Sequence, residues 1–72
     1  MDGRRIILQM KYARIIDGLA RKLGITLSRA LDLFYSTKTL EMIDRGIADM
    51  HCRSDIYLID EVALELQDNK NI

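Results

Sequence analysis

Apolar residues recur at helical spacing through most of the chain. Between residues 5 and 23 they stand three or four positions apart, which predicts a helix with one buried face. That face consists of Leu8, Tyr12, Ile15, Ile16, Leu19 and Leu23. Gly24 follows directly and suits a left-handed C-cap, so the helix should end there. Residues 4–10 also fit a short strand, because Ile6, Leu8 and Met10 alternate along one side.

Two shorter helices are predicted between Gly24 and Gly46. Thr26 is a suitable N-cap for a helix that runs to about Ser36. Hydroxyl side chains are concentrated at residues 36–39 and compete for helical hydrogen bonds, so a break is expected before a third helix that ends at Gly46. The positions expected to face the core are Leu27, Ala30, Leu31, Phe34, Leu40, Ile43 and Ile47.

A fourth helix is predicted from Asp55. Ser54 supplies a capping oxygen, and the Asp55 carboxylate stands in the positive first turn. Its buried face would be Ile56, Ile59, Val62, Ala63 and Leu66, and its solvent side Asp60, Glu61 and Glu65. Residues 67–72 are predicted to form a polar, frayed tail. The chain is therefore expected to be one all-α domain of four helices over residues 1–72, with a ribbon-helix-helix fold as the alternative.

With 72 residues, the predicted domain buries little apolar surface and has a thin core. Domains of this size often need a disulfide, a metal or a partner. The single cysteine, Cys52, cannot form a disulfide within the chain, which favours a reducing cytoplasm. The longest apolar run has three residues, so no membrane segment is expected. We therefore expect association, either as a homodimer or with a partner protein.

Charge is divided between the two halves, although the net charge is zero. Residues 1–38 carry eight bases and three acids, whereas residues 39–72 carry three bases and eight acids. Such asymmetry indicates either a nucleic-acid face with an acidic tail, or halves that pack on each other or on a second copy. In the nucleic-acid reading, Arg4 and Arg5 would flank a DNA-reading strand.

Partner contacts are predicted where apolar or aromatic side chains stand beside acids. Leu58 and Leu64 lie off the buried face of the fourth helix, so they either contact a partner or pack under another helix. Aromatic residues are common at the centre of protein interfaces, and acids suit the rim. The predicted contact residues are Tyr35, Tyr57, Leu58, Asp60, Glu61 and Leu64.

His51 and Cys52 are the only histidine and the only cysteine. One such pair falls short of the four ligands of a structural zinc, and we expect no metal and no cofactor. His51 would hydrogen-bond its loop and Cys52 would be buried. Arg45 and His51 have the spacing used by some small helical ribonucleases, with His as base and Arg steadying phosphate charge. A ribonuclease is therefore a further alternative.

Several stretches between Ala20 and Glu65 carry a family resemblance. They are Leu-Gly-Ile-Thr-Leu-Ser-Arg-Ala-Leu-Asp-Leu-Phe-Tyr (23–35), Thr-Leu-Glu-Met-Ile (39–43), the Met-His pair (50–51) and Tyr-Leu-Ile-Asp-Glu (57–61). With these, the chain resembles a family of short bacterial proteins catalogued as a domain of unknown function. The resemblance implies a small helical protein encoded beside other small proteins, including ADP-ribosyltransferase-like ones, in the manner of toxin–antitoxin pairs. It implies no catalytic residues.

A second, shorter resemblance concerns DNA binding. The residues Arg-Lys-Leu-Gly-Ile-Thr-Leu-Ser (21–28) are similar to the junction between the helices of ribbon-helix-helix antitoxins. A dimeric DNA-binding regulator is therefore kept as an alternative function. The main expectation is a non-enzymatic protein-interaction module, acting as an accessory or antitoxin-like partner.

Overall fold

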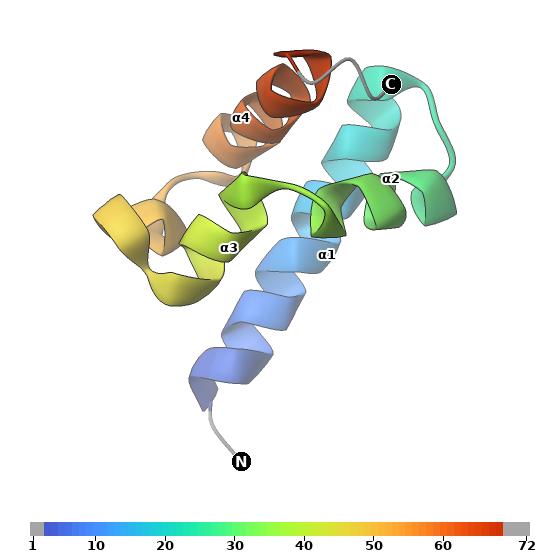
Figure 1. Cartoon of the computed structure of the whole chain (residues 1–72). Helices are drawn as coiled ribbons and strands as arrows, with labels where there is room; N and C mark the ends of the chain where they lie inside the picture. The colour runs from blue at the N-terminus through green and yellow to red at the C-terminus, as the bar shows by residue number, and fades with distance from the viewer. Residues whose placement is uncertain (1–2, 69–72) are drawn as a thin grey trace.

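The computed structural model describes residues 3–68, and its regular elements are all helical (Figure 1). They are α1 (Gly3–Leu23), α2 (Leu27–Tyr35), α3 (Lys38–Arg45), the 3₁₀ helix η1 (Ile47–Cys52) and α4 (Asp55–Asp68). The all-α prediction is confirmed, with η1 as an additional short element between the third and fourth predicted helices. No helix in the described part of the chain has the length and hydropathy needed to cross a bilayer.

The strand alternative at the start of the chain is wrong. Residues 4–10 form the first turns of α1, so the ribbon-helix-helix fold is excluded together with its strand. A helix gains one hydrogen bond for each added residue, whereas a lone strand needs a neighbouring strand for its backbone groups. The predicted tail also begins too early, because Gln67 and Asp68 belong to α4. The rest of that tail, residues 69–72, lies outside the described residues.

Local hydrogen bonds set the helix ends where the sequence predicts them. Gly24 adopts a left-handed backbone with φ 67°, and this ends α1. Thr26 Oγ1 accepts a hydrogen bond from the Arg29 amide at 3.1 Å, and Ser54 Oγ accepts one from the Tyr57 amide at 3.1 Å. These two side chains cap α2 and α4 as expected.

One core holds the helices together. Its fully buried large side chains are Phe34, Ile15, Leu19, Ile43, Leu58, Leu66 and Val62. The buried face of α1 is largely as predicted, and α2 and α4 both pack against it. Where α1 approaches α4, a Cβ on Gly18 would stand within 3.2 Å of Ile59 Cγ1. A glycine there lets the two helices come close.

The buried faces of α2 and α4 differ from the prediction. Leu27 and Leu31 are exposed, and Leu33 is buried in their place. On α4, Ile56 is 74% exposed and Leu58 is 0% exposed. Both helices carry two overlapping apolar stripes, so periodicity alone does not select between them.

The connection between α3 and α4 is also different from the expectation. Met50 is buried there, whereas Ile47 and Cys52 are exposed, so the predictions for Ile47 and Cys52 are wrong. Ala48 and Asp49 have left-handed angles, φ 53° and 56°, which kink η1. This kink turns Met50 into the core and leaves its neighbours at the surface.

The start of α3 is capped from two directions. Thr37 Oγ1 accepts a hydrogen bond from the Leu40 amide at 3.3 Å. From α4, the Glu65 carboxylate accepts hydrogen bonds from the Lys38 amide at 2.6 Å and the Thr39 amide at 3.0 Å. It also accepts one from Thr39 Oγ1 at 2.8 Å. Glu65 is therefore a structural residue and not part of the solvent side.

Candidate functional site

An exposed apolar region lies along α1 and α2. We call it the α1–α2 surface and define it as Ile6, Met10, Ala13, Ile16, Leu27 and Leu31. Met10 is 58% exposed, Leu27 57% and Leu31 40%. The N-terminal turns of α1 extend beyond the other helices, which leaves their outer side uncovered (Figure 1). Large apolar groups gathered in this way are typical of interaction sites.

Helical geometry places these residues together. At about 100° per residue, Ile6, Met10 and Ala13 fall within about 60° of one another on α1. Ala13 then meets α2, where Ala13, Ile16, Leu27, Ser28 and Leu31 line a hollow of about 380 Å³. The strip on α1 therefore leads into a notch between the two helices.

The basic side chains of α1 differ in the ion pairs that they form. Lys11 Nζ lies 3.2 Å from Asp55 Oδ1, and Arg14 Nε lies 2.6 Å from Asp55 Oδ2. The Arg14 hydrogen bond, helped by Lys11, holds the pKa of the Asp55 carboxyl below its usual value. Arg5 is exposed and makes no ion pair within the described residues. It lines a shallow hollow with Arg4, Leu8 and Asp44.

A smaller apolar face lies on the outer side of α4. We call it the α4 face and define it as Tyr57, Asp60, Glu61 and Leu64. Tyr57 and Leu64 are exposed and fall within about 20° of each other around the helix. The Arg53 guanidinium carbon lies 5.4 Å from the centre of the Tyr57 ring. Asp60 forms an ion pair with Lys22 at 3.1 Å.

The structure thus separates the six predicted contact residues. Four of them form the α4 face. Leu58 lies in the core and is not available to a partner, which corrects its place in the predicted set. Tyr35 is exposed at the end of α2 and is not part of the α4 face. It lies on the same side of α2 as Leu31.

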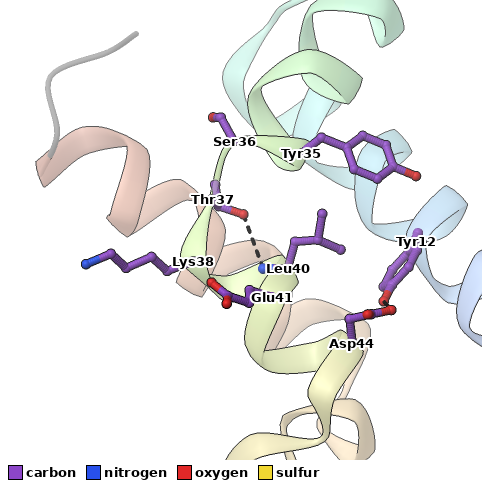
Figure 2. A pocket seen from close by; sticks show the side chains of 8 residues that line it. All are labelled: Tyr12, Tyr35, Ser36, Thr37, Lys38, Leu40, Glu41 and Asp44. Carbon is purple, nitrogen blue, oxygen red and sulfur yellow. Dashed lines mark hydrogen bonds between the residues drawn. The ribbon is translucent and has the colours of Figure 1, made fainter.

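A second hollow, of about 490 Å³, lies where α1 passes the turn between α2 and α3 (Figure 2). It is lined by Tyr12, Tyr35, Ser36, Thr37, Lys38, Leu40, Glu41 and Asp44. Figure 2 shows the rings of Tyr12 and Tyr35 on one side and the Lys38 ammonium pointing away from them. The Tyr12 hydroxyl donates a hydrogen bond to Asp44 at 3.1 Å.

Tyr12, which lines this second hollow, takes part in hydrogen bonding and in packing. Burial, together with the hydrogen bond to Asp44, raises the pKa of Tyr12 to about 12. The hydroxyl therefore stays protonated at neutral pH and acts as a donor. The Tyr12 ring also meets the Phe34 ring edge-on, with centroids 5.5 Å apart, so it serves the core as well as the hollow.

Arg45 and His51, the two residues of the ribonuclease alternative, lie in different surroundings. Arg45 lies 3.5 Å from Glu41 on α3 and is exposed. His51 Nδ1 is buried without a hydrogen-bond partner, and it lies 3.3 Å from the position of a Cβ on Gly46. In residues 3–68, no group of three or more His, Cys, Asp or Glu side chains is placed to hold a metal ion.

The periodicity did not reveal the α1–α2 surface as a binding surface. It placed Leu27 and Leu31 in the core and treated Ile6 and Met10 as strand residues. One signal for the surface does exist in the sequence, since Ile6, Met10 and Ala13 stand opposite the buried face of α1 at helical spacing. No family model, curated protein or solved structure matches the chain. The candidate surfaces therefore rest on their geometry.

Proposed function

We propose that the chain is a non-enzymatic protein-binding module that receives an apolar partner on the α1–α2 surface. The observation that carries this proposal is the exposure of Met10, Leu27 and Leu31 around the notch between α1 and α2. Full burial of such a side chain stabilises by about 1.5–3 kcal/mol, so covering several of them supports a stable complex. An amphipathic helix is a suitable occupant of a groove of this kind.

An accessory or antitoxin-like role is consistent with this mode of binding. The resemblance between residues 20 and 65 and a family encoded beside other small proteins supports a protein as the ligand. We further propose the cytoplasm as the compartment, because the lone cysteine is exposed and has no second cysteine in the chain to pair with.

The test compares two exposed apolar residues that differ in position. Leu31→Asp places a charge in the notch, and Ile56→Asp places the same charge on α4, outside the α1–α2 surface. Proteins that bind a tagged copy in its native host are identified, purified and titrated against each variant. We expect Leu31→Asp to weaken binding at least about tenfold, and Ile56→Asp to retain it.

Both substitutions are at exposed positions, so circular dichroism and urea unfolding should show that each variant keeps the wild-type helix content. A partner that binds both variants equally, or is lost from both, would place the contact elsewhere. Binding of a second copy counts in the same comparison as binding of another protein.

A further inference from the structure

The second hollow, beside Tyr12 and Tyr35, is large enough to receive a ligand group. Its volume of about 490 Å³ lies within the range of about 300–1,000 Å³ that is common for ligand pockets. The rings of Tyr12 and Tyr35 lie on one side of it, and Tyr35 is exposed (Figure 2). The kind of ligand that fits depends on the hydrogen-bonding groups that the lining leaves unused.

The hydroxyl groups of the lining donate within the chain. Ser36 Oγ and Thr37 Oγ1 each donate a hydrogen bond at 2.7 Å to a backbone carbonyl of α2. The Tyr12 hydroxyl donates to Asp44 Oδ1. A hydroxyl has a single proton, so these three oxygen atoms have only acceptor sites left for a ligand.

The backbone amides and the lysine of the lining add few donors. The amides of residues 36–38 and of residue 40 all form hydrogen bonds within the chain. The Lys38 ammonium points away from the two tyrosine rings (Figure 2). The Tyr35 hydroxyl is thus the donor that remains beside the rings among the lining residues described. An anionic ligand, whose oxygen atoms only accept, is poorly matched to this hollow.

Two carboxylates, those of Glu41 and Asp44, also line the hollow. Glu41 forms a surface ion pair with Arg45, whereas Asp44 forms no ion pair within residues 3–68. Arg4 and Arg5 share a separate hollow with Asp44 and do not line this one. A carboxylate and an aromatic ring both attract a cation, so the hollow is suited to a positively charged group with N–H donors.

The second hollow continues the notch of the α1–α2 surface. Ile16 of α1 and Leu31 of α2 line the notch. Tyr12 and Tyr35, which line the second hollow, stand four residues further along these two helices. One helical turn advances about 5.4 Å, so a long side chain of a polypeptide in the notch reaches the hollow.

We propose that the second hollow binds a cationic side chain, an arginine guanidinium or a lysine ammonium, of the protein that occupies the α1–α2 surface. This inference rests on the proposed function and specifies the partner. The cation lies against the Tyr35 ring and donates hydrogen bonds to the Asp44 carboxylate. Arginine suits the site better than lysine, because its planar group stacks on an aromatic ring while its N–H groups bind a carboxylate.

The n-butylguanidinium ion tests the hollow without a partner protein. Amide NMR spectra of isotope-labelled protein are recorded while n-butylguanidinium chloride is added at constant ionic strength. The control is n-butylurea, which has a similar shape and no charge. We expect saturable shifts of the Tyr35 and Asp44 signals with the cation and not with the urea. An absence of these shifts, or an equal response to the urea, overturns the proposal.

Two substitutions remove the two attractions separately. Asp44→Asn should raise the Kd of n-butylguanidinium about threefold or more, and Tyr35→Leu about two- to fivefold. Asp32→Asn is the matched control, because Asp32 is an exposed acid of α2 that does not line the hollow. All three positions are exposed, so circular dichroism should show the wild-type helix content. Binding that survives Asp44→Asn, or that falls equally in Asp32→Asn, contradicts the assignment.

The partner protein separates this inference from the proposed function. A partner identified in the native host should bind Asp44→Asn more weakly than Asp32→Asn. If Leu31→Asp releases the partner but Asp44→Asn binds it like the wild type, the inference about the hollow fails and the proposed function stands. Partner binding that Leu31→Asp leaves unchanged rejects the proposed function, whether or not n-butylguanidinium binds in the hollow.

Discussion

The contact that joins α4 to α3 offers the sharpest test of the fold. Glu65 accepts three hydrogen bonds, two from the backbone amides of Lys38 and Thr39 and one from Thr39 Oγ1. These amides are in the first turn of α3, where a helix has no internal acceptors for them. We predict that Glu65→Gln destabilises the protein although it changes the shape of the side chain very little.

The magnitude follows from the geometry. A glutamine oxygen in place of Oε1 keeps both bonds to Thr39, but the amide group in place of Oε2 then points a donor at the Lys38 N–H. One charge-assisted hydrogen bond, worth about 1.5–3 kcal/mol, is lost together with about 0.3–1 kcal/mol of interaction with the helix dipole. Partial exposure reduces this sum, so we expect the free energy of unfolding to fall by about 2 kcal/mol.

Urea unfolding followed by circular dichroism measures this difference. For a domain of this size, about 2 kcal/mol corresponds to a Tm lower by roughly 8–16 °C. Glu41→Gln is the matched control, because the Glu41 carboxylate is exposed and its interaction with the Arg45 guanidinium, at 3.5 Å, is a surface ion pair. It should cost less than about 1 kcal/mol. Equal losses in the two variants would refute the reasoning that Glu65 caps α3.

Three further predictions concern pH and the backbone. Because the fold lowers the pKa of Asp55, the free energy of unfolding should fall as the pH drops below about 4, and Asp55→Asn should flatten this part of the profile. Because the pKa of Tyr12 is raised to about 12, stability should also fall as the pH rises above 10, and a Tyr12→Phe variant that keeps this alkaline loss would contradict the assignment. Gly24→Ala and Gly46→Ala both force alanine into a left-handed backbone, at a cost of about 1–2 kcal/mol. Since only Gly46 has His51 within 3.4 Å of an added Cβ, urea unfolding should show the larger loss for Gly46→Ala.

The candidate site could be foreseen only in part. The length and the divided charge lead to the expectation that the chain associates, which stays a prediction, and four of the predicted contact residues share the α4 face. The α1–α2 surface was not predicted, because Leu27 and Leu31 have the spacing of core residues. They are exposed because α2 crosses α1 with Ala30, Leu33 and Phe34 turned inward.

The sequence by itself determined where the first helix ends and where the second and fourth helices begin. Gly24, Thr26 and Ser54 act through backbone angles and hydrogen bonds that span at most a few residues, so their effects are legible without knowledge of the fold. The helix period of the first segment likewise identified the buried face of α1, since only one broad apolar stripe runs through its second half.

The tertiary structure decided which of the two apolar stripes on α2 and on α4 is buried. It also decided which polar side chains form hydrogen bonds with residues far away in the sequence. On α4, the choice of Leu58 over Ile56 depends on where α1 and α3 lie. Glu65 reaches the start of α3 across 26 and 27 positions of sequence. Periodicity describes one helix at a time, whereas burial and long-range hydrogen bonding are properties of helices packed together.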